Sequence, residues 1–200
     1  MTDAYLVLHG LAIKKHADAA AVAAAIGLDV AEVQAVLDEA VAKGRALRAG
    51  EAYSLTPVAR VALDGACSRL FAAQRTDPAF IAAYERFEAI NRDLKALMTA
   101  WQTIEIDGES VLNDHVNKDY DDRLIDRLGA LHERAEAILQ QLSAGLPRLA
   151  IYAHKLEAAL ERAEDGAIEW VSGARIESYH TVWFELHEDL LRILGRTRQE

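Results

Sequence analysis

The sequence has 200 residues and a formal net charge of −10, and 52% of its residues are apolar. This apolar fraction excludes an intrinsically disordered chain, and the length allows one or two small domains with buried cores. A chain this acidic repels nucleic acid as a whole, so DNA binding would require a local basic patch.

Composition also predicts a mainly helical protein. Only 3 prolines and 11 glycines interrupt a sequence rich in alanine, leucine, glutamate and arginine, which favour helices. The one cysteine, Cys67, excludes an internal disulfide. The N-terminal residues lack the pattern of a signal peptide, and no apolar run approaches the roughly 20 residues of a membrane span. We therefore expect a cytoplasmic protein that does not cross a membrane.

The first domain is expected to span residues 1–75. Residues 3–16 have the apolar spacing of a short helix. Asp18 can cap a second helix that ends at Gly27, and Asp29 can cap a third. An apolar stripe with spacings of three and four runs along this third helix: Val30, Val33, Val36, Leu37, Ala40 and Val41. Two short helices joined by a turn that contains glycine predict a helix-turn-helix.

A small β-hairpin is predicted directly after these helices. Residues 45–55, RALRAGEAYSL, alternate in polarity and are broken by a turn at Ala49-Gly50-Glu51. Thr56 can then cap another helix, with Pro57 at its first position, and this helix should run over residues 58–74. Helix, helix-turn-helix and hairpin in this order predict a winged helix.

The first third of the chain resembles the winged helix of MarR-type transcription regulators. The resemblance lies in ADAAAVAAAIGLDVAEVQAVLDEAVAKGRAL, with its AKGRAL lead into the hairpin, and in SLTPVARVAL, with its LTPVAR exit. It implies DNA binding by a homodimer. The helix at residues 30–43 would then lie in the major groove, and the hairpin would lie near the phosphates.

Residues for DNA contact can be named on this interpretation. Gln34 can read a base, because a glutamine side chain can pair with adenine. Cations for the phosphate backbone would come from residues of the helices and hairpin: Lys14, Lys15, Lys43, Arg45 and Arg48.

The charge pattern opposes this interpretation in part. The third helix also carries Glu32, Asp38 and Glu39, and residues 1–65 hold six basic and eight acidic residues. The hairpin tip is short, whereas MarR-type wings usually carry an acid and an arginine at a longer tip. A second interpretation therefore stays open, in which the winged helix docks onto a protein partner, because a fold does not fix a function.

The second domain is expected to span residues 76–200 and to begin at Thr76-Asp77-Pro78. Four helices are predicted, at about residues 78–102, 119–143, 146–164 and 174–195. Residues 103–117 between the first two are expected to form a loop with a turn at Asp107-Gly108. Short links between the later helices predict an antiparallel four-helix bundle that would serve for ligand sensing or dimerisation.

A polar group within this bundle is a candidate binding site for a small-molecule effector. The last helix places His180, Trp183 and His187 on one apolar seam, with Glu177 one turn before His180, and Asn91 is the polar member of the seam at residues 78–102. The alternative is that these histidines are core residues whose polar atoms are bonded to Asn91 or to a carboxylate.

The catalytic and metal-binding motifs considered for this sequence are incomplete. Glu177-x-x-His180 is one half of the paired motif of a di-iron bundle, and Cys67 lacks a second cysteine for a metal site. We therefore expect no enzyme activity, metal or cofactor. The segment SYHTVWFELHEDLLRILGR resembles a segment of regulators that are associated with phosphoenolpyruvate-utilising, dikinase-type enzymes. This resemblance keeps open a role as an accessory protein of such an enzyme system.

Overall fold

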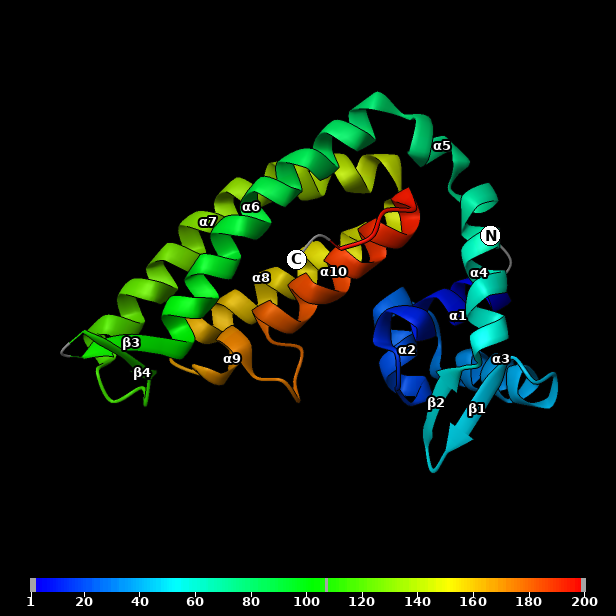
Figure 1. Ribbon diagram of the computed structural model, residues 1–200, viewed down its shortest axis with the longest axis horizontal. Coiled ribbons are helices and arrows are strands. Elements are labelled where there is room, and N and C mark those ends of the chain that lie inside the picture. Colours follow the sequence, from blue (N-terminus) through cyan, green and yellow to red (C-terminus); the bar gives the residue numbers. More distant parts are fainter. Residues whose placement is uncertain (1–2, 107, 199–200) are drawn as a thin grey trace. The chain divides into compact units, whose positions relative to one another are not determined.

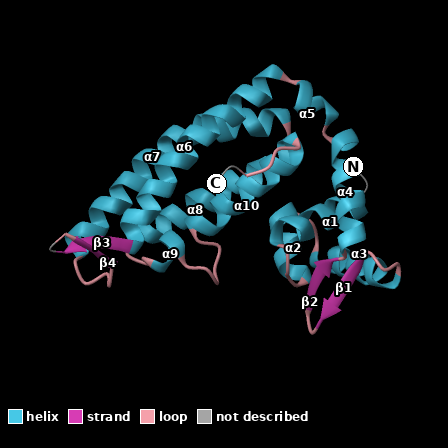
Figure 2. Ribbon diagram, viewed as in Figure 1, coloured by secondary structure: helices cyan, strands magenta, loops and turns pink. Residues whose placement is uncertain are grey.

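The computed structural model describes residues 3–106 and 108–198. The chain is mainly helical, with 74% of it in helices. Two small antiparallel sheets of two strands each complete the described secondary structure (Figures 1 and 2). The chain divides into two compact units, the first made of residues 1–77 with 187–200 and the second of residues 78–186.

Three helices open the first unit: α1 (Asp3–Lys14), α2 (Ala19–Ile26) and α3 (Val30–Ala42). Both predicted caps are present, since Asp18 accepts a hydrogen bond from the Ala21 amide and Asp29 accepts from the Ala31 amide. Gly27 ends α2 in the left-handed conformation, with φ of 72°. Because of this tight turn, the chain direction changes by 117° between α2 and α3.

The hairpin of the first unit consists of β1 (Ala46–Ala49) and β2 (Ala52–Leu55), paired as predicted. Gly50 makes the turn with a φ of 63°. Ala17 forms an antiparallel bridge with Tyr53, which adds a third extended segment beside β2. The Tyr53 side chain is fully buried and ties the hairpin to the helices.

The helix predicted over residues 58–74 is interrupted. Instead, α4 (Pro57–Leu70) and α5 (Ala72–Thr76) meet at Phe71, whose backbone leaves the helical conformation. The Phe71 side chain is buried at 1% exposure and packs against the His9 ring, with 5.5 Å between centroids. The Phe71 ring is thus buried at the point where the helix breaks. The local sequence pattern does not reveal this break.

Five helices and a short 3-10 turn, η1, belong wholly or partly to the second unit: α6 (Pro78–Gln102), α7 (Lys118–Gly145), η1 (Pro147–Leu149), α8 (Ala150–Glu164), α9 (Glu169–Ser172) and α10 (Tyr179–Leu194). α6 and α7 run antiparallel (Figure 1). Pairs across them fit this direction, since Arg86 bonds to Gln141 and Arg134 pairs with Asp93 at 2.7 Å. α8 packs against α7.

Two predictions for this region are wrong. Residues 103–117 contain a hairpin, β3 (Thr103–Ile106) and β4 (Glu109–Leu112), where a loop was expected; the predicted turn includes residue 107, which lies outside the described residues. The last helix begins at Tyr179, not near residue 174. The Ser178 hydroxyl accepts a hydrogen bond from the Thr181 amide and so caps the N-terminus of this helix. The β-branched residues Thr103, Ile104, Ile106 and Val111 favour strands in the segment that forms the hairpin.

The compact units also differ from the expected domains in one respect. Their division after Asp77 lies close to the expected boundary at residue 76, but residues 187–200 group with the first unit. Within the described chain, no single helix combines the length and apolar character needed to cross a membrane. α2 and α3 reach that length only as a bent pair, and their apolar residues form much of the core of the first unit.

Candidate functional site

The exposed side of α3 and the hairpin form a hydrogen-bonded cluster around Asp38. Gln34 donates to Asp38 at 3.0 Å, and the Tyr53 hydroxyl donates to the other carboxylate oxygen at 2.8 Å. Arg48 from β1 pairs with Asp38 at 3.5 Å. The bonds from Gln34 and Tyr53 lower the pKa of Asp38 below its usual value. The acid therefore orders the predicted base reader, Gln34, against the hairpin.

The other residues predicted to contact DNA belong to the first unit. Lys43 forms an ion pair with Glu39 one turn earlier, which lowers the pKa of Glu39. Arg45 is exposed just before β1. Lys14 is the last residue of α1, and Lys15 follows it with a left-handed backbone, with φ of 67°. Two of the three acids that oppose phosphate binding are thus already paired with side chains of this surface.

Of the predicted ligand-binding residues, the structure joins Asn91 and Trp183. The indole Nε1–H of Trp183 donates to Asn91 Oδ1 at 3.0 Å. The Trp183 ring is 2% exposed and stacks on Phe87 with 4.7 Å between centroids. Asn91 thus satisfies the one polar atom of a buried indole, whereas the core interpretation expected Asn91 to bond to a histidine.

The remaining three members of that group have separate surroundings. Glu177 forms an ion pair with Lys155 of α8 at 2.5 Å. Half-buried His180 has a pKa below its usual value because burial disfavours its charged form. His187 is buried and groups with the first unit.

The second unit holds another buried histidine, which gives a pH prediction. Burial lowers the pKa of His132 on α7, whose Nδ1 lies 3.2 Å from the Tyr179 hydroxyl. Below about pH 6.5 the unfolded chain therefore binds more protons at His132 and His180 than the folded chain does. Stability from these two groups is present above pH 6.5 and is lost as the pH falls.

Urea unfolding at pH 7 and pH 5 tests this sign. Replacing His132 and His180 with glutamine should reduce the acid-induced loss of unfolding free energy, by at most about 1.4 kcal/mol per pH unit for each histidine. His154→Gln, which removes an exposed imidazole from α8, is the matched control. An unaltered pH dependence in the double variant would contradict the assignment.

Three residues that sequence reasoning did not bring together meet in the core of the first unit. His9 Nε2 of α1 lies 2.7 Å from Asp189 Oδ1 of α10, and His9 Nδ1 lies 3.8 Å from Cys67 Sγ of α4. All three are at most 2% exposed. Although a thiol, an imidazole and a carboxylate in this order resemble a nucleophile with its base, burial raises the pKa of Cys67 and favours the unreactive thiol. We interpret the group as a structural link between α1, α4 and α10.

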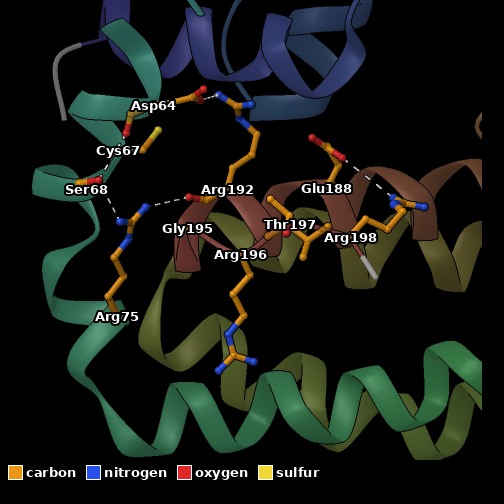
Figure 3. Close-up of a pocket in the computed structure, with 11 residues that line it drawn as sticks. Asp64, Cys67, Ser68, Arg75, Glu188, Arg192, Gly195, Arg196, Thr197 and Arg198 are labelled. Carbon is orange, nitrogen blue, oxygen red and sulfur yellow. Dashed lines mark hydrogen bonds and ion pairs between the residues drawn. The ribbon is translucent and has the colours of Figure 1, made fainter. Parts of the chain in front are cut away.

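A pocket of about 490 Å³ adjoins this core within the first unit (Figure 3). Its walls come from α4, α5, the end of α10 and the residues that follow α10. The lining side chains are mostly polar or charged: Asp64, Cys67, Ser68, Arg75, Glu188, Leu191, Arg192, Gly195, Arg196, Thr197 and Arg198.

Arg75 holds the end of α10 in this pocket. Its guanidinium donates to the Ile193 carbonyl at 2.7 Å, to the Arg192 carbonyl at 3.2 Å and to the Ser68 hydroxyl at 2.9 Å. A cation at the last carbonyls of a helix offsets the negative end of its dipole. Gly195 then ends the helix with a φ of 65°, and a Cβ there would lie 2.9 Å from the Arg75 guanidinium.

Gly195→Ala should therefore lower the free energy of unfolding by about 1–3 kcal/mol, because alanine is strained at this φ and would displace Arg75. Urea unfolding measures the change. Gly65→Ala in the exposed middle of α4 is the control, since nothing lies within 4 Å of a Cβ there. This control should be neutral or stabilising by up to about 1 kcal/mol. Equal stability of the two variants would exclude the proposed role of Gly195.

One signal for this pocket was present in the sequence. Arg192, Arg196 and Arg198 fall within seven residues of an otherwise acidic chain. Their nearness to Arg75 and to the His9–Asp189 pair depends on contacts across more than 100 residues, which local spacing does not encode.

Comparisons with protein-family models, with curated proteins and with solved structures found no match to this chain.

Proposed function

We propose that this chain is a DNA-binding transcription regulator whose first unit is a winged helix. The observation that carries the proposal is the join between α2 and α3. Their directions differ by 117° across a three-residue turn that begins with left-handed Gly27. DNA-binding helix-turn-helix motifs join their helices at about 90–120° through a turn of this length.

The extended segments support the same proposal. The Ala17–Tyr53 bridge and the β1–β2 hairpin follow the order that a winged helix requires. The resemblance of residues 17–63 to MarR-type regulators implies the same function. On this proposal α3 enters the major groove, where Gln34 exchanges its bonds with Asp38 and Tyr53 for bonds to a base.

The charged residues of α3 and of the β1–β2 hairpin affect how strongly such a protein binds DNA. Pairing of Asp38 with Arg48 and of Glu39 with Lys43 reduces the repulsion between α3 and phosphate. Lys14, Lys15 and Arg45 supply further positive charge, and a homodimer doubles it. The residual acidity of the chain suppresses non-specific binding, so that specific contacts carry more of the affinity.

The second unit is proposed to form an antiparallel helical bundle that supports dimerisation or ligand sensing. Its long antiparallel helices α6 and α7 support this role. A small-molecule effector within the second unit, near Asn91, Glu177, His180 and Trp183, remains part of the proposal. It would regulate DNA binding only by favouring one arrangement of the chain over another.

A second candidate function is docking onto a protein partner. Exposed apolar side chains favour it: Val30 of α3 is 48% exposed, and Val58 and Val61 of α4 are 79% and 73% exposed. Apolar residues on a surface that also carries acids fit a protein better than a phosphate backbone. By the resemblance of the C-terminal segment, we propose a phosphoenolpyruvate-utilising, dikinase-type enzyme as one such partner.

Fluorescence anisotropy with mixed genomic duplexes distinguishes the two candidates. The regulator should bind at about 50 mM salt, should bind less tightly at about 200 mM salt, and should enrich fragments that share a palindromic site. Absence of binding at the lower salt concentration would reject DNA as the target and favour the protein partner.

A further inference from the structure

We propose that the pocket between α4, α5 and the end of α10 binds a small organic anion with at least two negative charges, carried by phosphate or carboxylate groups. The pocket lies within the first unit and shares no residue with the proposed DNA-contacting set (Figure 3). This inference does not depend on the proposed function, because it would hold equally for a protein-binding module.

Charge is the first argument. Four arginines and two acids line the pocket, so it keeps a positive excess in a chain whose net charge is −10. Arg192 pairs with Asp64 at 2.7 Å, and Arg198 pairs with Glu188 at 4.0 Å. Arginines gathered in a concave site raise the local concentration of anions.

The second argument is the state of the Arg192 guanidinium. Its terminal nitrogen bonds to Asp64, but its Nε is buried and makes no hydrogen bond within the described structure. The side chain as a whole is 11% exposed. A buried donor without an acceptor costs free energy, so Arg192 would gain from a side-chain rotation that brings this group to an anionic oxygen in the pocket.

The third argument concerns the end of α10, which by itself would repel an anion. The negative end of the helix dipole points to this region, but Arg75 covers the carbonyls of Arg192 and Ile193. Gly195 leaves room for that guanidinium because it has no Cβ. The local repulsion is therefore offset before a ligand arrives.

Size and chemistry define the ligand class. A volume of about 490 Å³ lies within the range of sites for small molecules, which is roughly 300–1,000 Å³. Arginine forks match the planar geometry of a carboxylate and the oxygens of a phosphate. Ser68 and Thr197 add hydroxyl groups, while Leu191 and Cys67 provide a less polar wall for the organic part of the ligand.

Calorimetric titration of the full chain tests the site, with pyrophosphate and citrate as probes and with ionic strength matched by chloride. At least one of the two should bind and should raise the Tm above that of the chloride control. Binding of pyrophosphate alone would assign phosphate ligands, and binding of citrate alone would assign carboxylates. No binding of either anion beyond chloride would overturn the proposal.

Variants then locate the binding. Arg192→Gln and Arg196→Gln should each weaken binding of the bound anion by about tenfold, because each removes a charged donor. Arg69→Gln removes the same charge from an exposed position of α4 outside the pocket and should change affinity by less than about twofold. Arg196 lies after α10, so its variant keeps the test informative if Arg192→Gln fails to fold. Equal weakening by Arg69→Gln, or none by Arg196→Gln, would contradict the site.

Discussion

Replacing Asp189 with leucine should lower the free energy of unfolding by about 3–5 kcal/mol. Asp189 and His9 are 0% and 1% exposed, and their side chains lie 2.7 Å apart. Loss of the carboxylate leaves the imidazole buried without this partner, and α10 loses a polar link to α1. Urea unfolding followed by far-UV circular dichroism measures the change.

The double variant His9→Leu with Asp189→Leu separates the pair from general effects of the substitution. Removing both partners abolishes the buried polar group together with its bond, so the double variant should be more stable than Asp189→Leu alone. Asp126→Leu, at an exposed position of α7, should alter stability by no more than about 0.5 kcal/mol. If the loss of unfolding free energy in the double variant equals the sum of the losses in Asp189→Leu and in His9→Leu alone, the pair has no special role.

The second prediction concerns DNA. Arg45→Glu combined with Arg48→Glu should weaken DNA binding at least about tenfold and should reduce the slope of log affinity against log salt by about 2, because two phosphate contacts are lost. The reversal also removes the ion-pair partner of Asp38, which then keeps only its hydrogen bonds from Gln34 and Tyr53. Anisotropy titrations at several salt concentrations give both numbers.

A charge-matched variant controls for the more negative chain. Arg123→Glu with Arg127→Glu makes the same change in net charge on exposed positions of α7, which belongs to the second unit. Its affinity and salt slope should stay close to those of the unmodified protein. Equal losses in the two double variants would mean that net charge alone, and not this surface, governs binding.

Local chemistry made much of the first unit predictable. The ends of α2 and α3 are set by side-chain caps at Asp18 and Asp29 and by the left-handed turn at Gly27. These features depend on residues only a few positions apart. The β1–β2 turn at Gly50 depends equally on its neighbours. Such elements can be read from a sequence because their causes lie within a few residues of one another.

Longer-range features could not be predicted in this way. The break at Phe71 depends on where its ring is buried, and the β3–β4 hairpin has strands of only four residues each, which a loop-like composition conceals. His9 and Asp189 are separated by 180 residues. The predicted effector group came from two different helices. Trp183 bonds to Asn91, whereas Glu177 bonds to Lys155, and packing between helices sets these partners.

Hydrogen–deuterium exchange of the full chain, with and without a duplex recovered by selection, tests the central proposal most directly. A winged helix bound through α3 and its hairpin should show slower amide exchange over residues 30–55 when DNA is added, and unchanged exchange along α7. Uniform exchange with and without DNA, or protection confined to other segments, would contradict the proposal that this surface reads DNA.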